Sequence, residues 1–422
     1  MLIYLATVFG LVLAGAAMVQ WIISLIFRNR FLRHQPADDN RAIPKKAAVI
    51  MSVRGCDPSL GDSLLGVLNQ DYPDYSVHLV IDHKTDQAWE FVHDLKSQHD
   101  QRDLLAIHEL RDPPETCSLK CHAIVQAFEQ VAADTQWVAL LDADVTPHPQ
   151  WLAELTGPLN DPNVGAVTGN QWFEPDAPAS IGSLTRSAWN AGAMVLTIMF
   201  CNPWAGSFAM RFGDVRRSGL LETWKRSIVD DGPIRSAVNR LGLKIHFAPS
   251  LIMVNREPCT FAYVNRWVTR MLTWSRLYEK TYFVSVIHAV FSNSVMIANF
   301  AFLFIALGVQ DWIAAAVAAG LLIVSGILSV AAFIAARSCA VHSCRLRGVD
   351  LPKLSFTRMA AVFSLVAVGQ MIYGVSCLRA LVVKQIKWRD ITYQLTRHDD
   401  IKRLNYQPYQ PQTGESKSRV SI

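Results

Sequence analysis

The stretch Val138-Ala139-Leu140-Leu141-Asp142-Ala143-Asp144 decides how the rest of this chain is interpreted. Its apolar residues are typical of a buried strand in a covered, mostly parallel sheet, and two carboxylates follow where that strand ends. Such sheets bind ligands beyond the carboxyl ends of their strands. One residue between Asp142 and Asp144 lets both carboxylates converge on a hard divalent cation, Mg²⁺ or Mn²⁺, and its phosphate ligands. An isolated Asp-x-Asp is more often a solvated corner, so the surrounding sequence must decide.

Strand-like and helix-like segments alternate from residue 47 to residue 258. Strands are expected at 47–53, 76–82, 104–110 and 138–141, and helices at 58–69, 86–98 and 120–132. This alternation predicts an α/β domain of Rossmann-like type, with a mostly parallel sheet covered by helices on both faces. Neither GxGxxG nor GxxxxGK[ST] is present, so side chains and a metal ion would have to hold any nucleotide.

The composition indicates a membrane protein with a separate polar domain. Of the 422 residues, 51% are hydrophobic and only 18% are charged, and the apolar excess is confined to a few segments. A net charge of +5 is too mild to indicate nucleic-acid binding. The eight cysteines have neither a disulfide framework nor the paired spacing of a zinc site, and we interpret them as reduced cytoplasmic thiols.

Four segments are apolar and long enough to cross a bilayer, at residues 1–27, 281–308, 312–336 and 359–383. Residues 1–27 are expected to be a signal anchor with its amino terminus outside, because positive charge follows the apolar run instead of preceding it. A linker (28–46), a cytoplasmic catalytic domain (47–258), an interfacial segment (259–280), a C-terminal membrane region (281–383) and a polar tail (384–422) would follow. The protein would thus be a multi-pass integral membrane protein, of the inner or plasma membrane if bacterial.

The number of crossings is left open by the sequence. Four complete spans would place the tail outside, whereas its Lys and Arg content favours the cytoplasm. One segment would then be re-entrant or interfacial, and residues 281–308 are the first candidate because they carry several polar side chains. Residues 407–422 are expected to be disordered.

Acidic residues fall at the ends of the expected elements throughout the polar domain. Asp82 closes the second strand, Asp142 and Asp144 close the fourth, and Asp230-Asp231 precedes a helical stretch at 232–241. A basic and aromatic segment, residues 266–276, comes just before the membrane region. Each feature is ordinary alone, but the ordered set indicates one site.

With these features the chain resembles the membrane-bound family-2 glycosyltransferases of the GT-A fold, most closely the ceramide-glucosyltransferase-like branch. The resemblance covers roughly residues 1–400. It is carried by the Asp-x-Asp and Asp-Asp motifs and by residues 53–58, 70–73, 206–210 and 388–395, which read VRGCDP, QDYP, GSFAM and WRDITYQL.

The resemblance implies roles for the matching residues. Asp82 would bind the uridine of a UDP-sugar, and Asp142 and Asp144 would hold the metal ion and the diphosphate, with Asp144 the more direct ligand. Asp231 would be the general base that takes the proton from the acceptor hydroxyl. Lys120 could support the phosphates, although a solvated lysine is an equally good interpretation.

The basic and aromatic segment departs from the family's Q/R-x-x-R-W motif. Alignment on Arg270 and Trp274 puts Thr273 where arginine is expected, and alignment on Arg266-Trp267 puts Tyr263 at the Q/R position. We favour the first alignment, which assigns Arg270 and Trp274 to the donor site. Elsewhere, Ser52 replaces the usual proline of the first motif, and Asp230 replaces a glutamate.

These observations predict an inverting, metal-dependent glycosyltransferase that moves a sugar such as glucose from a UDP-sugar to a lipid hydroxyl. The acceptor would be a ceramide-like lipid, a hopanoid or a glycerolipid. Two alternatives stay open. A processive polysaccharide synthase would need more membrane helices than the four counted here. A non-catalytic membrane scaffold with the same fold is disfavoured by the intact acidic set and favoured by the imperfect Arg/Trp motif. A transporter would need ionisable residues in its spans, which here carry hardly any beyond His288.

Overall fold

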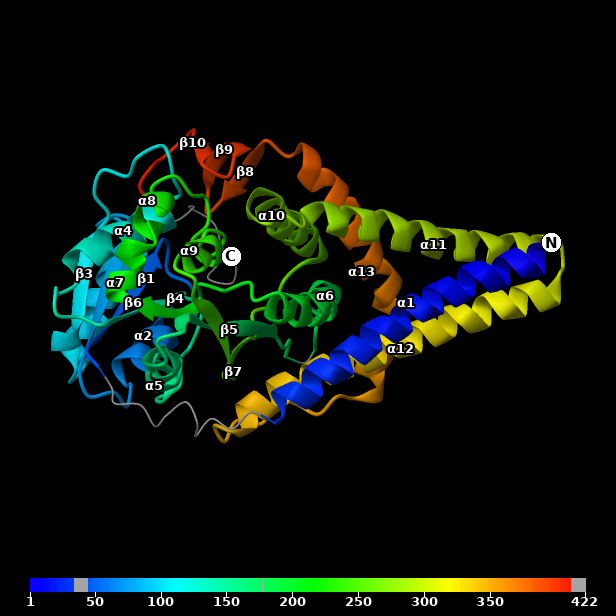
Figure 1. The fold of residues 1–422 in the computed structure, drawn as a ribbon, viewed down its shortest axis with the longest axis horizontal. Helices are drawn as coiled ribbons and strands as arrows, with labels where there is room; N and C mark the ends of the chain where they lie inside the picture. Colours follow the sequence, from blue (N-terminus) through cyan, green and yellow to red (C-terminus); the bar gives the residue numbers. More distant parts are fainter. Residues whose placement is uncertain (34–44, 177, 411–422) are drawn as a thin grey trace. The chain divides into compact units, whose positions relative to one another are not determined.

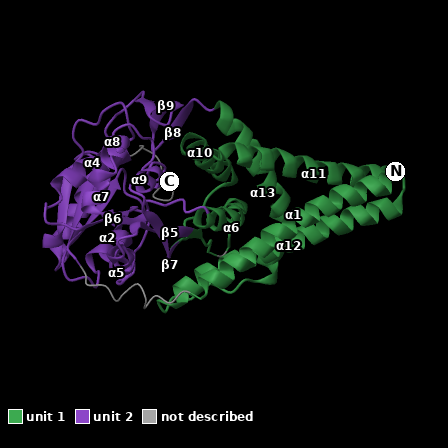
Figure 2. Ribbon diagram, viewed as in Figure 1, with its two compact units in different colours: residues 1–34, 172–199, 254–382 green, residues 35–171, 200–253, 383–422 purple. Residues whose placement is uncertain are grey.

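The computed structural model of the protein describes residues 1–33, 45–176 and 178–410. The chain divides into two compact units (Figure 2). Unit 1 comprises residues 1–34, 172–199 and 254–382, and unit 2 comprises residues 35–171, 200–253 and 383–422. Residues 34–44 of the expected linker and 411–422 of the expected tail lie outside the described residues.

A seven-stranded sheet organises unit 2, with the strand order β3-β2-β1-β4-β6-β5-β7 (Figure 1). The strands are β1 (Ala47–Val53), β2 (Tyr75–Ile81), β3 (Leu105–Glu109), β4 (Trp137–Leu141), β5 (Val164–Phe173), β6 (Ser207–Arg211) and β7 (Lys244–Asn255). Strands β3, β2, β1 and β4 pair in parallel, and β6 runs antiparallel to both β4 and β5. The predicted mostly parallel α/β sheet is confirmed, and the first four strands lie within two residues of their predicted bounds.

Helices cover both faces of this sheet because alternate strand residues point to opposite sides. The helices of unit 2 are α2 (Leu60–Leu68), α3 (Gln87–Gln98), α4 (Leu119–Gln130), α5 (Trp151–Thr156), α7 (Phe212–Arg217), α8 (Leu220–Trp224) and α9 (Ile234–Arg240). On one face, Val49 and Leu79 share a core with Leu64 of α2, Val92 of α3 and Leu152 of α5. Helix α4 packs on β1 and β2 from the opposite face.

A second, three-stranded antiparallel sheet lies in the segment expected only to be a polar tail. It consists of β8 (Gln385–Trp388), β9 (Ile391–Arg397) and β10 (Asp400–Arg403). Trp388 pairs with Ile391, so Arg389 and Asp390 form a two-residue turn with φ values of 49° and 63°. Such a turn needs positive φ at both central positions, which is unusual for residues other than glycine, asparagine or aspartate.

Unit 1 contains six helices among its described residues: α1 (Leu2–Phe31), α6 (Ile181–Met199), α10 (Phe261–Tyr278), α11 (Tyr282–Gly308), α12 (Trp312–Arg345) and α13 (Phe356–Val382). By length and composition, α1, α11, α12 and α13 could each cross a membrane. These four correspond to the four apolar segments of the sequence. Helix α11, the expected candidate for a re-entrant segment, is one uninterrupted helix of 27 residues.

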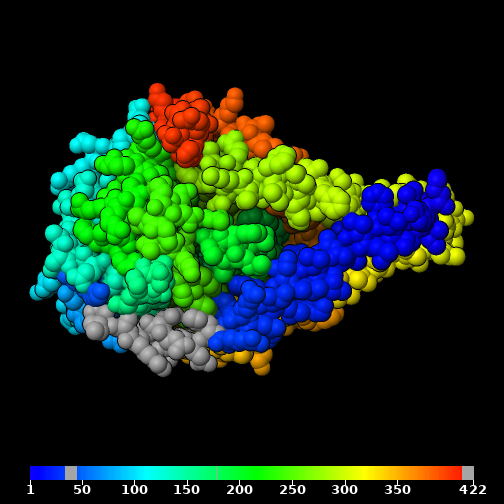
Figure 3. Space-filling view, viewed as in Figure 1, coloured from blue at the N-terminus to red at the C-terminus, as the bar shows by residue number. Residues whose placement is uncertain are grey.

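Helices α1, α11 and α12 form a bundle (Figure 3). At one end, Leu2 and Leu303 pack around a small core of Ala306, Ala314 and Ala315, next to the turn that joins α11 to α12. Toward the other end, Arg28 Nε of α1 donates to Ser338 Oγ of α12 at 2.9 Å. The bundle therefore has an apolar end at the α11–α12 turn and a basic end where α1 and α12 both terminate in arginines.

The contacts of helix α13 hold both of its ends toward the basic end of the bundle. Near its start, Arg358 pairs at 2.8 Å with the fully buried Glu174, which also binds Arg337 of α12. Near its end, Cys377 O accepts a 2.7 Å hydrogen bond from Tyr282 Oη at the beginning of α11. Figure 1 shows that α13 does not reach the α11–α12 turn.

Candidate active site

The predicted carboxylates gather at one edge of the main sheet. Asp82 follows β2, and Asp142 and Asp144 follow β4, with β1 between the two strands. Because these strands are parallel, their carboxyl ends meet at the same edge. The structure therefore brings these carboxylates together as the sequence predicted, and their role as a site stays a prediction.

The turn after β4 is fixed by backbone contacts. Val145 N donates to Asp142 O at 3.1 Å, and Ser63 Oγ of α2 donates to Ala143 O at 2.8 Å. Asp142 N donates to Gly206 O at 3.2 Å. A Cβ at Gly206 would lie 2.6 Å from Asp142 Oδ2, so only glycine lets the carboxylate approach this closely.

Lys120 links two of the acidic groups. It lies in the first turn of α4, which begins where the Ser118 side chain accepts a hydrogen bond from Cys121 N. Its Nζ is 2.6 Å from Asp142 Oδ1 and 2.8 Å from Asp230 Oδ2. Burial lowers the pKa of Lys120, but the two carboxylates outweigh that effect and raise the pKa above its usual value. The lysine is therefore a partly buried cation held by two carboxylates, and its proposed support of the phosphates stays a prediction.

Asp230 and Asp231 lie in the loop before α9, and the charge of Asp230 acts on Asp231. Asp230 is buried and paired with Lys120, and burial raises its pKa. For Asp231, burial and the neighbouring charge of Asp230 raise the pKa to about 7. A carboxylate whose pKa lies near neutral pH is well suited to accept a proton in catalysis.

The carboxylates after β4 fit a divalent cation whose remaining ligands come from a substrate. Among the described residues, no group of three or more histidine, cysteine, aspartate or glutamate side chains could hold a metal ion. Mg²⁺ is commonly bound by one or two carboxylates together with substrate phosphates, without a complete protein cage. Asp142 Oδ1 is paired with Lys120 at 2.6 Å, and the assignment of Asp144 as the more direct ligand stays a prediction.

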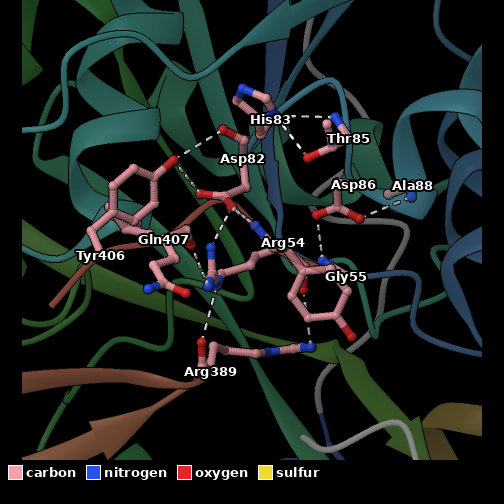
Figure 4. Close-up of polar contacts among 12 residues, drawn as sticks. Arg54, Gly55, Asp82, His83, Thr85, Asp86, Ala88, Arg389, Tyr406 and Gln407 are labelled. Carbon is pink, nitrogen blue, oxygen red and sulfur yellow. Dashed lines mark hydrogen bonds and ion pairs between the residues drawn. The ribbon is translucent and has the colours of Figure 1, made fainter. Parts of the chain in front are cut away.

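Asp82 is enclosed by residues that the sequence did not single out (Figure 4). Its carboxylate accepts hydrogen bonds from the Arg54 guanidinium, from Tyr409 N at 2.9 Å and from Tyr406 Oη at 3.2 Å. Arg54 also donates to Gln407 O at 3.1 Å. The expectation that residues 407–422 are disordered is therefore wrong at Gln407 and Tyr409, which make specific hydrogen bonds, and residues 411–422 lie outside the described residues.

Arg389 of the β8–β9 turn ties the small sheet to the first strand-to-helix turn of the domain. Its guanidinium forms two bonds to Asp57, at 2.8 and 2.6 Å, and its carbonyl oxygen accepts from Arg54 Nε at 3.0 Å. Both partners lie in stretches that supported the family resemblance, VRGCDP and WRDITYQL. Their presence in two distant motifs was the only signal that could have indicated the contact.

Arg270 and Trp274 lie on α10 in unit 1, and their assignment to the donor site stays a prediction. The alternative tryptophan, Trp267, packs edge-on against Phe173 and Trp189, with ring centroids 5.4 and 5.1 Å away. Trp267 therefore has a packing role within unit 1.

Comparison with known proteins agrees with the resemblance. The sequence profile of glycosyl transferase family 21 matches residues 8–401, which confirms the similarity to the ceramide-glucosyltransferase-like branch. No curated protein matches.

Two solved structures show limited similarity. A mannosyltransferase from Pyrobaculum calidifontis, in complex with GDP-Man and Mn²⁺, is 17% identical with a TM-score of 0.49, covering 89% of this chain and 99% of its own. Glucosyl-3-phosphoglycerate synthase from Mycobacterium tuberculosis, in complex with Mn²⁺ and UDP, is 13% identical with a TM-score of 0.38, covering 57% and 84%. Both scores are below 0.5, so the family match alone carries the relationship.

Proposed function

The chain belongs to glycosyl transferase family 21, and from this premise we propose that it transfers a sugar from a UDP-sugar to the hydroxyl of a membrane lipid. The observation that carries the proposal is the combination of an acidic site at a sheet edge with four long apolar helices in one chain. A nucleotide sugar is soluble, whereas a lipid acceptor lies in the bilayer, so an enzyme that joins them needs both parts.

The residues at the sheet edge would each perform a different part of an inverting sugar transfer. Asp231 takes the proton from the acceptor hydroxyl, which is a poor nucleophile until it is deprotonated. The oxygen then attacks the anomeric carbon as the bond to the UDP oxygen breaks, and one base suffices because no covalent enzyme intermediate forms. Lys120 places a fixed positive charge beside the leaving diphosphate. A divalent cation held by Asp142 and Asp144 would supply further stabilisation of that charge.

The raised pKa of Asp231 predicts how activity depends on pH. The base is active when deprotonated, so kcat should rise with pH through about 7, the pKa of Asp231. Asp230→Asn removes a neighbouring negative charge and should lower the pKa of Asp231, which extends activity to lower pH. Measuring kcat from acidic to basic pH checks this, and an unchanged acid limb in the variant would assign that limb to another group.

The reaction itself is tested with purified protein in detergent, Mn²⁺ or Mg²⁺, a panel of radiolabelled UDP-sugars and a total lipid extract. Label in a single lipid of the organic phase would support the proposal and identify both donor and acceptor. Label only in a water-soluble polymer would indicate a polysaccharide synthase, and no transfer from any donor would contradict enzymatic activity.

We also propose that α1, α11 and α12 cross the membrane and that α13 does not. The first support is the number of membrane crossings that the chain can make between two parts of unit 2. The chain leaves unit 2 after residue 253 and returns to it at residue 383. Among the described residues of unit 2 there is no helix long and apolar enough to cross a membrane, so we take unit 2 to lie on one side, and the helices between residues 253 and 383 would then cross an even number of times. Three candidate spans lie in this interval, and one of them must therefore stay on the side of unit 2.

Helix α13 is the best candidate for the helix that does not cross. A Cβ at Gly326 of α12 would touch the ring of Phe363, and one at Gly374 would touch Asn293 of α11. At a helical rise of about 1.5 Å per residue, Gly326 of α12 and Asn293 of α11 each lie roughly 20 Å from the α11–α12 turn. The arginines at the ends of α1 and α12 would then face the cytoplasm, together with unit 2.

Cysteine labelling in sealed vesicles distinguishes the alternatives. Cysteines introduced one at a time at Val309, Asp350 and Arg397 would be probed with an impermeant maleimide, in a background where the exposed Cys201 and the partly exposed Cys56 and Cys259 are replaced by serine. We expect Asp350→Cys and Arg397→Cys to label from one side and Val309→Cys from the other. If positions 309 and 397 label from the same side and position 350 labels from the other, the proposal is contradicted. In that case either α11, α12 and α13 all cross the membrane, or α12 and α13 cross and α11 does not. Position 309 labelling from the side of unit 2 would identify α11 as the exception.

A further inference from the structure

The carboxylate proposed to bind the uridine is covered by the end of the chain itself. Asp82 is only 3% exposed, although it lies at the open edge of the sheet where a ligand is expected. Its Oδ2 accepts from Arg54 and from Tyr409 N, and its Oδ1 accepts from Tyr406 Oη. Since a carboxylate oxygen has about two acceptor positions, Oδ2 is saturated.

The covering segment, residues 406–409, is anchored just before it begins. Leu404 N donates to Thr392 O at 2.9 Å, and Asn405 Oδ1 accepts from Thr392 N at 2.7 Å, so residues up to 405 are held by β9. Beyond this point, the hydrogen bonds of the segment are made with Asp82 and Arg54 (Figure 4). The segment can therefore separate from Asp82 without loss of the β8–β10 sheet.

The covering segment presents to Asp82 and Arg54 the same kinds of group as a nucleobase does, namely an N–H donor and planar rings. Tyr409 N is an amide donor, as is the imide N–H of uracil, and the tyrosine rings lie 5.9 and 5.6 Å from the Arg54 guanidinium carbon. The Tyr409 ring also lies against the backbone of Gly55, where a Cβ would approach its Cζ to 3.0 Å. Burial and the charge of Asp82 raise the pKa of Tyr406 to about 12, so its hydroxyl remains a donor at neutral pH.

We propose that residues 406–409 form a displaceable cover on the nucleobase site, so that the UDP moiety and the C-terminal segment compete for Asp82 and Arg54. The proposal rests on the proposed use of a UDP-sugar. Donor binding would release the segment, and the free enzyme would be held in a state of low donor affinity. If the cover is closed for about nine-tenths of the time, the apparent affinity for UDP is lowered about tenfold.

Truncation tests the proposal in the full membrane protein. A chain ending after Asn405 should bind UDP in the presence of Mn²⁺ about tenfold more tightly than the intact chain, as measured by calorimetry in detergent. A chain ending after Gln410 is the matched control, because it keeps the cover and should bind as the intact chain does. Thermal unfolding of both shows whether the domain remains folded.

A point variant and hydrogen exchange provide independent readouts. Tyr406→Phe removes one hydrogen bond to Asp82 and should tighten UDP binding about 2- to 10-fold. In the intact chain, UDP should accelerate amide exchange in residues 406–410, because Tyr409 N loses its acceptor.

Other results of the truncation and exchange experiments would overturn the proposal that residues 406–409 compete with UDP. If truncation weakens UDP binding, and UDP slows amide hydrogen exchange in residues 406–410 of the intact chain, the segment forms part of the nucleotide pocket and does not compete with UDP. If truncation leaves the affinity for UDP unchanged, the nucleobase binds elsewhere. The donor assignment fails separately, since GDP binding without UDP binding in every variant would refute the proposed UDP-sugar. Failure of all variants to bind any nucleoside diphosphate would refute the donor site itself.

Discussion

Replacing Asp231 with asparagine is expected to abolish sugar transfer and to leave UDP binding nearly unchanged. The side chain keeps its size but loses the ability to accept a proton, and general base catalysis is worth about 10²- to 10⁴-fold in rate. The donor should bind normally, because the nucleotide and metal contacts are assigned to Asp82, Asp142 and Asp144 on other strands. The effect should therefore appear in kcat.

The measurement is a radiolabel transfer assay paired with UDP calorimetry on the same preparation. Asp134→Asn is the matched control, because Asp134 precedes β4 and lies in an exposed ion pair with Lys46 at the opposite edge of the sheet. Such a surface pair contributes little, and the control should retain full activity. Loss of UDP binding in Asp231→Asn would contradict its role toward the acceptor.

The sheet and its acidic edge were predictable because both follow from local sequence. A run of apolar residues such as Val138 to Leu141 has to be buried, and the first polar residues after it must lie at the strand's end. Several such strands in parallel bring Asp82 and Asp142 to one edge without any knowledge of long-range contacts. Lys120 lies beside Asp142 as the sequence suggested, but its bridge from Asp142 to Asp230 depends on a loop whose course the sequence does not determine.

The C-terminal sheet was missed because its turn lacks the usual signal. A two-residue hairpin turn normally contains glycine or asparagine, whereas this one uses Arg389 and Asp390. Arg389 is held there by its two bonds to Asp57, more than 300 residues earlier in the sequence. The order of residues 407–410 depends in the same way on Arg54 and Asp82. Composition cannot reveal contacts of this kind, and for this reason it led to an expectation of disorder that is wrong at Gln407 and Tyr409.

Hydropathy alone could not distinguish α13, the helix proposed not to cross the membrane, from the helices proposed to cross it, because the distinction again depends on long-range contacts. The helix is as apolar and as long as α11, and only its partners distinguish the two. Both of its ends bind residues near the basic end of the bundle, through Glu174 at the start and Tyr282 at the end. The polar residues of α11 that made it the first candidate are partly accounted for by this packing, since Ser292 Oγ accepts from Gln370 of α13 at 2.5 Å.

Asp144→Ala is expected to remove the dependence of UDP binding on a divalent cation. In the unchanged protein, Mn²⁺ should strengthen UDP binding, because an ion held by the carboxylates after β4 would stabilise the charge of the diphosphate. Even groups one step removed from a metal's ligands are worth about 10- to 100-fold in metal affinity, so loss of a direct ligand should cost at least as much. Asp142 cannot readily compensate, since its Oδ1 is already paired with Lys120 at 2.6 Å.

Titrations of UDP with and without Mn²⁺, repeated with Mg²⁺, measure this effect for Asp144→Ala and for Asp134→Ala as the control. The variant should bind UDP equally weakly under all conditions, while the control should keep its metal dependence. Unchanged Mn²⁺-dependent binding in Asp144→Ala would move the metal away from the end of β4. In that case Lys120 would be the principal charge beside the diphosphate, and Lys120→Met would then weaken UDP binding more than Asp144→Ala does.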